Sequence, residues 1–177
     1  MEWHNEPDDW HEDGDGLALT VESDTDCWRH TRHGFVADDA HCYLRPVAGD
    51  FTATVAFSGG YDSQYDQAGL MVRADAETWL KCGLEYLDGE ELASAVVTRE
   101  YSDWSVSPLD DAERVWTRVE RIDETVEVSV STDGDDYRMV RQAYLTDAGE
   151  LRVGPMAAAP QGEGFDVTFE GFTVETG

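Results

Sequence analysis

Basic residues and long apolar runs are what this sequence has little of. It contains eleven arginines and one lysine against 39 acidic residues, which gives a net charge of −27 over 177 residues. A charge of this size repels nucleic-acid phosphates and anionic membranes, so we expect neither as a partner. No apolar stretch reaches the length of a membrane span, and none at the start of the chain is typical of a signal peptide. We therefore expect a soluble, cytoplasmic protein.

The acidic residues are spread along the whole chain, and the sequence has only one isoleucine beside its single lysine. Such a composition is typical of adaptation to molar salt, because salt screens the repulsion between carboxylates while the carboxylates keep the surface hydrated. We therefore expect a halophilic source, with an ordinary acidic protein as the alternative. On the halophilic interpretation most carboxylates are an adaptation to salt and take no part in the chemistry of a site. Lys81 stands out as the one lysine that was not replaced.

Disorder is another interpretation of a high net charge, but the chain is 41% hydrophobic and has six tryptophans, seven tyrosines and six phenylalanines. It should therefore fold, and its length is that of one domain with a full core, which we place at residues 1–177. Cys27, Cys42 and Cys82 are odd in number and not closely paired. They predict reduced thiols rather than a disulfide framework.

Two-residue alternation of side chains runs through most of the chain, between turns rich in glycine and aspartate. The clearest one-sided strand is residues 51–58. Three segments are ambiguous: residues 101–108 (loop or irregular strand), 110–113 (one helical turn) and 138–145 (strand or helix). About a dozen short strands, with no helix longer than a turn or two, predict an all-β fold, either a β-sandwich or a closed barrel.

Three further segments give specific expectations. Residues 1–16 are polar and turn-rich, and we expect Trp3 and Trp10 to tie them onto a sheet. Residues 27–32 predict a strand. The small residues at 157–160 predict a loop.

The most informative stretches are residues 66–73 and 79–86, two strands joined by a short turn. Their core faces carry alternating apolar residues. Their opposite faces carry a cation, an acid, an amide and an indole in place of the small polar residues of an ordinary solvated face. These residues are Gln67, Met71, Arg73, Trp79, Lys81 and Glu85. We expect this second face to floor a binding groove.

Seven short stretches carry a resemblance to a known family. They are residues 25–31 (TDCWRHT), 34–35 (GF), 66–73 (DQAGLMVR), 79–81 (WLK), 102–105 (SDWS), 154–157 (GPMA) and 160–161 (PQ). Together they resemble a family of uncharacterised domains that includes the fungal "regulation of enolase" protein. The sequence departs from the family at Cys27, where an aromatic residue is expected, and at Cys82, where a small one is expected.

This family is similar in fold to the concanavalin A-like lectins and glucanases. The resemblance therefore implies a jelly-roll β-sandwich of two antiparallel sheets, one of them concave and lined by solvent, and it implies no settled activity. Proteins of this superfamily commonly bind sugars on the concave sheet. On this analogy the indoles of Trp28, Trp79 and Trp104 would stack on sugar rings.

A catalytic role would require acid and base groups on the same face. Retaining glycosidases use two carboxylates about 5 to 5.5 Å apart, and glucanases of this superfamily commonly supply them in an E-x-D-x-x-E pattern, which the strand with Glu85 lacks. Glu85 beside Lys81 is still a candidate general acid or base, because neighbouring charge and burial shift a pKa. The alternative is a salt bridge between the two across the sheet face.

Cysteine and histidine are common metal ligands, and four of them lie close in the sequence: Cys27, His30, His33 and His41. Cys27 and His30 should point to opposite faces of an extended strand, whereas a structural zinc site needs four convergent ligands. We therefore predict no metal or other cofactor, and we place His30 in the groove beside Trp28.

Arginines offer a second kind of ion site. The planar guanidinium suits carboxylate or phosphate, so Arg73, Arg99 and Arg118 would bind an anion if they met in space. The alternative is that each compensates a local acid.

The sequence thus predicts a ligand-binding jelly roll whose concave sheet binds a carbohydrate, a similar polyol or another small polar metabolite. The stacking residues would be Trp28, Trp79 and Trp104, and the polar contacts would come from His30, Gln67, Arg73, Lys81, Glu85 and Arg99. One alternative is an enzyme acting on a sugar or small metabolite through Glu85 and Lys81. Another is an interaction module that regulates a metabolic enzyme through a protein partner.

Overall fold

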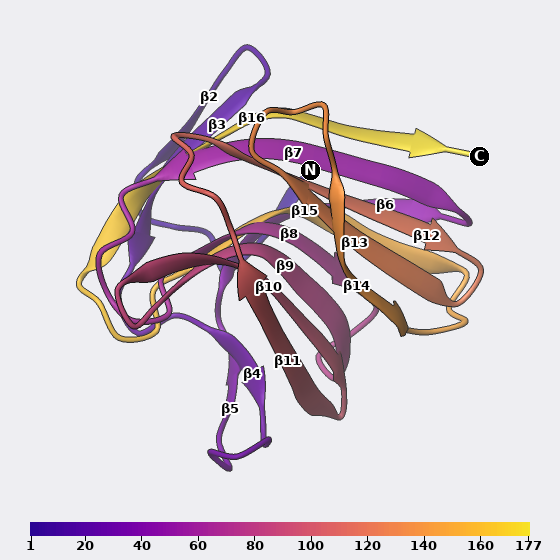
Figure 1. The fold of residues 1–177 in the computed structure, drawn as a ribbon. Coiled ribbons are helices and arrows are strands. Elements are labelled where there is room, and N and C mark those ends of the chain that lie inside the picture. Colours follow the sequence, from indigo (N-terminus) through magenta and orange to yellow (C-terminus); the bar gives the residue numbers. More distant parts are fainter.

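The computed structural model describes residues 1–177 as sixteen β-strands without a helix (Figure 1). Two seven-stranded antiparallel sheets lie face to face, and two further strands form a separate ribbon. Sheet A has the order β1 (Glu2–His4), β6 (His41–Ala48), β15 (Glu150–Ala158), β8 (Gln67–Arg73), β9 (Thr78–Leu87), β10 (Glu90–Arg99) and β11 (Tyr101–Pro108). Sheet B has the order β14 (Arg138–Tyr144), β13 (Thr125–Ser131), β12 (Val115–Ile122), β7 (Phe51–Gly59), β16 (Gly164–Thr176), β3 (Gly16–Glu22) and β2 (Trp10–Asp13). This architecture confirms the predicted β-sandwich.

A single large hydrophobic core of 28 buried residues fills the space between the sheets. Sheet A contributes alternate residues such as Leu70 and Leu84, and sheet B contributes Phe57 and Phe169, whose ring centroids lie 6.0 Å apart. Because successive side chains of a strand point to opposite faces, the residues between them are directed away from this core. On β8 and β9 those outward positions are the ones that the sequence assigned to a groove.

The chain has no helix that is long and apolar enough to span a bilayer.

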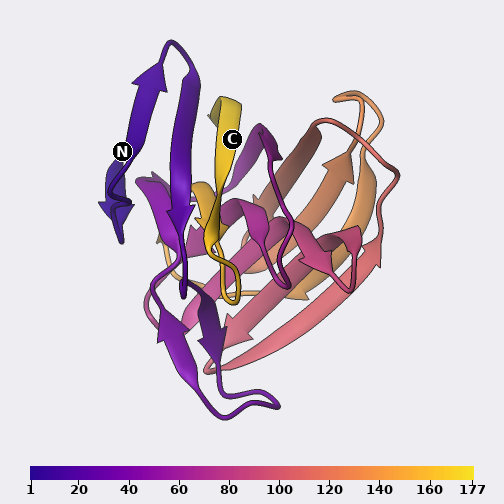
Figure 2. The ribbon, with the colours of Figure 1, turned by 90° about the vertical axis from the view of Figure 1, so that its left-hand side faces the viewer.

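The ribbon consists of β4 (Cys27–Arg29) and β5 (Val36–Asp38), which pair antiparallel. In both ribbon views its tip projects from the sandwich (Figures 1 and 2). The predicted strand over residues 27–32 therefore stops at Arg29. His30, Arg32 and Gly34 have φ values of 58°, 63° and 77°, and these left-handed conformations reverse the chain into β5.

Residues 101–108 and 138–145, which were ambiguous in the sequence, become the edge strands β11 and β14. Two expectations were wrong. Residues 110–113 contain no helical turn, and Ala157 and Ala158 belong to β15 rather than to a loop. Hydrogen-bonded ladders to β6 and β8 on both sides of β15 outweigh the weak strand preference of alanine.

The first sixteen residues are tied to the sandwich through their tryptophans, as expected. Trp3 stacks on Tyr43 with ring centroids 4.7 Å apart, and Trp10 meets Trp3 edge-on at 5.2 Å. This aromatic cluster holds the short strands β1 and β2 at the ends of the two sheets. Such short strands explain why the structure has more strands than the dozen or so that alternation indicates.

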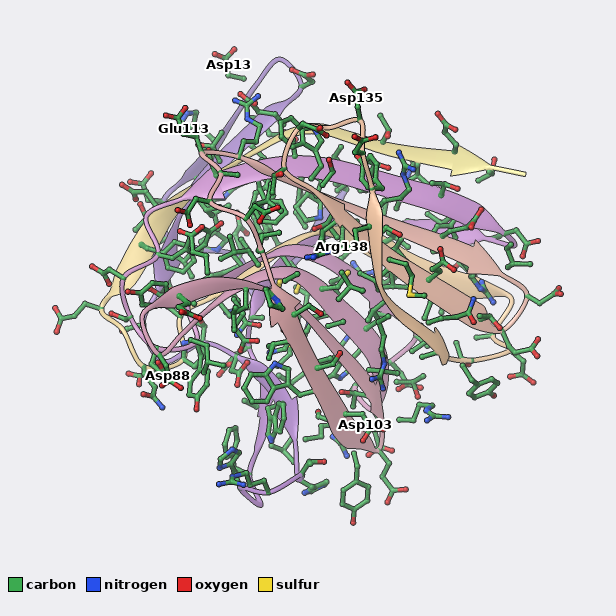
Figure 3. All side chains as sticks on the ribbon, viewed as in Figure 1. Asp13, Asp88, Asp103, Glu113, Asp135 and Arg138 are labelled. Atoms are coloured by element: carbon green, nitrogen blue, oxygen red, sulfur yellow. The ribbon has the colours of Figure 1, made fainter.

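Acidic side chains point outward from widely separated parts of the molecule. Figure 3 labels five of them, Asp13, Asp88, Asp103, Glu113 and Asp135, and all five are exposed. Most of the charge of −27 therefore lies at the surface, where like charges repel one another through water.

We expect this repulsion to make stability depend on salt. Raising KCl from about 0.1 M to about 1 M shortens the screening length from about 10 Å to about 3 Å. The melting temperature should rise by about 5 °C or more, as followed by circular dichroism. NaCl should act like KCl, because screening depends on ionic strength. A melting temperature that stays constant or falls would contradict a repulsive surface.

Candidate functional site

The outer face of sheet A is divided into two halves, and the β4–β5 ribbon covers one of them. Under the ribbon lies a second hydrophobic cluster of nine buried residues, among them Met71, Trp79 and Val96 of the sheet and Cys27 of the ribbon. Trp79 is only 1% exposed. A buried indole cannot stack on a ligand from solvent, so the structure places Trp79 in a small core and not among the binding residues.

The other half of the face floors a cleft of about 260 Å³. Gln67, Lys81, Glu85 and Val96 of sheet A line its base. One wall comes from the ribbon and the residue before it, with Asp26, Trp28, His33 and Phe35. The remaining lining residues are Tyr65, Trp104, Pro160 and Gln161.

Lys81 and Arg73 each fasten the ribbon to sheet A through an ion pair. Lys81 Nζ donates to Asp26 Oδ1 at 2.7 Å, immediately before β4. Arg73 holds both carboxylate oxygens of Asp38 at 2.7 Å each, at the end of β5. Arg73 therefore fixes the wall of the cleft from outside its lining, and the predicted ligand contact by Arg73 has no support in this geometry.

The electrostatics of these pairs show how strongly they are held. Burial opposes the charge of Lys81, but Asp26 and Glu85 outweigh it and raise the pKa of the ammonium. Burial also opposes the charge of Asp38, while hydrogen bonds from His4 and Arg73 lower the pKa of its carboxyl to about 2. Lys81 and Asp38 thus keep their charges at neutral pH.

Glu85 is the second ionisable group on the cleft floor, and it is only 6% exposed. Its Oε2 accepts hydrogen bonds from Ser94 Oγ at 2.6 Å and from Trp104 Nε1 at 2.8 Å. Burial raises the pKa of Glu85, against the opposing effects of Lys81 and these two donors. Its Oε1 has no donor in the protein and is not sealed from solvent.

Lys81 and Glu85 do not form the salt bridge that the sequence allowed, since the ion pair of Lys81 is with Asp26 and Glu85 has none. Residues four apart on one strand are separated by about 13 Å, which puts their polar atoms beyond direct contact. Gly83 stands between them, and a Cβ there would lie 2.1 Å from the carbonyl oxygen of Ala68. The floor between the two charges is therefore bare backbone.

Trp104 and Tyr65 form an aromatic corner of the cleft. Their ring centroids are 6.3 Å apart in an edge-on arrangement, and Trp104 is 40% exposed. The backbone of Tyr65 is fixed to β9 by its N–H, which donates to the carbonyl of Tyr86 at 2.7 Å. Buried Asp66 accepts the Ser63 N–H at 2.9 Å and so stabilises the loop that presents Tyr65.

The remaining predicted site residues are scattered. Trp28 lines the cleft with its Nε1 donating to the Thr31 carbonyl at 3.0 Å. His30 lies outside the lining, in the turn after β4, with its ring 5.3 Å from that of Tyr101. His33 lines the cleft in its place.

The three arginines do not converge. Arg73 pairs with Asp38, Arg99 lies 5.3 Å from the ring of Tyr144, and Arg118 lies 3.6 Å from the ring of Tyr137 on sheet B. The side chains of Cys27, His30, His33 and His41 do not converge either, and no group of three or more such side chains is arranged to hold a metal. His41, for example, is engaged by the carbonyl of Asn5 at 2.8 Å.

Sequence reasoning missed seven lining residues: Asp26, His33, Phe35, Tyr65, Val96, Pro160 and Gln161. Asp26 had a usable signal, because it lies two residues before Trp28 and therefore on the same side of an extended segment. Phe35, Pro160 and Gln161 lie in the stretches that carried the family resemblance. Tyr65 had no signal, because a loop residue has no periodicity to follow.

Free polar atoms in the cleft suit a ligand rich in hydroxyl groups. Glu85 Oε1 can accept a hydrogen bond, and so can Gln67 Oε1, since the Gln67 amide nitrogen is used by the Tyr65 carbonyl at 3.0 Å. Lys81 has donors beyond the one given to Asp26. Aromatic rings on two sides can cover the apolar faces of such a ligand.

The class of protein is therefore a two-sheet antiparallel β-sandwich with a cleft of about 260 Å³ on one sheet. Residues 3–177 match the family described as "Protein of unknown function (DUF1349)", and the chain belongs to this family. The resemblance seen in the sequence is thereby confirmed. A curated relative, "Regulation of enolase protein 1" of Saccharomyces cerevisiae, is 38% identical over 168 residues, covering 94% of this chain and 85% of the relative.

Solved structures agree on the fold. A functionally unknown protein from Saccharomyces cerevisiae superposes with a TM-score of 0.96 at 36% identity, covering 99% of this chain and 96% of that one. A variant of the GH43 protein BlXynB from Bacillus licheniformis gives 0.77 at 17% identity, over 97% of this chain but 36% of the larger protein. The carbohydrate binding module CBM66 from Bacillus subtilis gives 0.54 at 18% identity, over 90% and 95%.

Removing the partner of Lys81 tests the role assigned to the ion pair. Asp26→Asn keeps a hydrogen-bond acceptor but leaves the ammonium, which is 4% exposed, without a counter-charge. We expect a loss of about 3 kcal/mol in the free energy of unfolding, measured by urea denaturation. Glu77→Gln is the control, because it breaks the Arg29–Glu77 pair, in which Glu77 is 63% exposed, and should cost less than about 1 kcal/mol. Equal losses in the two variants would argue against a structural role for the buried pair.

Proposed function

We propose that this protein binds a carbohydrate or a similar polyol in the cleft on sheet A. The observation that carries the proposal is the exposed indole of Trp104, whose Nε1 is fixed to Glu85 Oε2 at 2.8 Å, so that ring and carboxylate face the cleft together. Rings of sugars have apolar C–H faces and polar rims. A fixed aromatic surface beside free hydrogen-bonding atoms is complementary to both.

The geometry favours binding over turnover. Burial opposes the charge of Lys81, but the ion pair with Asp26 outweighs it and raises the pKa of the ammonium, so Lys81 is a poor base at neutral pH. The likeness to a carbohydrate binding module, at 18% identity, extends to the fold. It supports the proposal only as a precedent for sugar binding on such a sandwich.

A screen of glycans and polyols by intrinsic tryptophan fluorescence tests this function, run in enough KCl to keep the protein folded. We expect at least one ligand to bind the wild type, and Trp104→Ala to weaken it by about tenfold or more, equivalent to about 1.4 kcal/mol. Isothermal titration calorimetry confirms the affinities without relying on the indole signal. Trp79 is unsuitable as a target because it is part of a core.

Trp116→Ala is the matched control. It also removes one indole, but from β12 of the opposite sheet, where Trp116 lies under Arg114 at 5.9 Å. Ligand binding should survive this change. If no glycan binds the wild type, or Trp104→Ala binds as well as Trp116→Ala, the sugar-binding proposal fails. Appearance of reaction products during the screen would favour the alternative of an enzyme.

A second candidate function is regulation of a metabolic enzyme through direct contact. The observation that favours it is the name of the yeast relative, together with exposed apolar side chains on the ribbon and on β11, at Phe35, Val36, Tyr101 and Val106. A protein partner could cover these residues. Co-sedimentation with purified enolase would favour this function, and its absence would leave the ligand-binding proposal standing alone.

A further inference from the structure

The charges that line the cleft do not balance. Lys81 and Asp26 neutralise each other at 2.7 Å, and Glu85 remains as a carboxylate without an ion pair. His33 is the other basic side chain in the lining. With the Lys81–Asp26 pair closed, Glu85 is the one acidic group of the floor without an ion-pair partner, and a ligand cation beside it would oppose the burial that raises its pKa.

The open atom of this carboxylate is well defined. Ser94 and Trp104 both donate to Oε2, which leaves Oε1 without a protein donor. Glu85 is 6% exposed and so has little water around it. A buried carboxylate is stabilised most by a cation that also donates hydrogen bonds, and a ligand ammonium meets both requirements.

Aromatic rings strengthen the preference for a cation. Trp104 sits directly beside Glu85, and Tyr65 lies 6.3 Å from Trp104. The faces of indole and phenol rings attract cations through their quadrupoles, and more so where water is excluded. A positively charged group bound to Glu85 would lie close to this aromatic corner.

Anionic ligands are disfavoured on the same grounds. No arginine lines the cleft, and Arg73, Arg99 and Arg118 are engaged elsewhere. On the cleft floor a uronate or a phosphate would meet the closed Lys81–Asp26 pair and the acidic Glu85, with His33 as the one further basic side chain of the lining. The overall charge of −27 adds a repulsive field at long range.

We infer that the ligand of the cleft is an amino sugar, a carbohydrate with a free, protonated amino group. Its N–H donates a hydrogen bond to Glu85 Oε1, while Trp104 and Tyr65 contact the sugar ring. This inference rests on the proposed function and names its substrate class. The ammonium compensates the charge of Glu85, and the hydroxyl groups of the sugar form hydrogen bonds with Gln67 and Lys81. The volume of about 260 Å³ suits one sugar ring rather than a long chain.

A panel of matched monosaccharides tests the inference on the wild-type protein. Glucosamine, galactosamine and mannosamine are titrated by calorimetry beside their parent hexoses, their N-acetyl derivatives and glucuronate, at neutral pH and the lowest KCl that keeps the protein folded. Ethanolamine serves as an amine without a ring. We expect at least one hexosamine to bind about tenfold or more tightly than its parent hexose, equivalent to about 1.4 kcal/mol. The acetylated form should lose this gain, because its nitrogen is uncharged.

Glu85→Gln then tests the residue. It replaces the carboxylate by a neutral group of the same shape, and the ratio of hexosamine to hexose affinity should fall to about one. Glu90→Gln is the control, since it removes the same charge from an exposed position at the start of β10, outside the cleft lining, and should keep the ratio.

Each outcome decides something different. Hexoses that bind as tightly as hexosamines, or a glucuronate that binds best, would overturn the amino-sugar inference while sugar binding stands. Ethanolamine binding as tightly as the hexosamines would overturn it in favour of a general cation site. If no sugar of the panel or of the wider glycan screen binds, the inference and the proposed function fall together. If Glu85→Gln still prefers hexosamines over hexoses, Glu85 is not the group that recognises the ammonium.

Discussion

The ion pair between Lys81 and Asp26 joins the outer face of sheet A to the ribbon that walls the cleft, and much of the site depends on it. A buried ammonium is costly unless a counter-charge compensates it, so the lysine at this position fixes where the residue before β4 must lie. Arg73 and Asp38 repeat the arrangement at the end of β5. The ribbon is therefore fastened at both of its strands. This attachment positions Trp28 and Phe35, which the ribbon carries, in the wall of the cleft.

The same ribbon separates two environments on one sheet face. Beneath it Met71 and Trp79 belong to an apolar cluster that excludes water, and beside it Gln67 and Glu85 remain within reach of a ligand. Val96 lies at the boundary, in the cluster and in the cleft lining. The boundary matters for electrostatics, because a carboxylate next to a dry cluster is poorly hydrated. Burial raises the pKa of Glu85 for this reason, and the bonds from Ser94 and Trp104 hold the carboxylate in a fixed orientation.

Fold and function are related here only through this local arrangement. The sandwich is shared with proteins of very different size. In the GH43 protein, for example, the matching part is 36% of the chain. Such a scaffold supplies a rigid sheet on which a groove can form. What the groove accepts is decided by a few side chains, and in this chain those are an aromatic corner and one unpaired carboxylate rather than a pair of acids.

Two-residue alternation in the sequence was enough to predict an all-β sandwich or barrel and to place Gln67, Lys81 and Glu85 on one face, because side-chain direction in a strand is a local property. The family resemblance selected the sandwich. The family resemblance added Trp28 and Trp104 to the site. Only the tertiary structure could show that Trp79 is covered, that the partner of Lys81 lies 55 residues away at Asp26, and that Arg73, Arg99 and Arg118 do not meet. The physical reason is that periodicity fixes which way a side chain points, whereas what covers or pairs with it comes from segments distant in the chain.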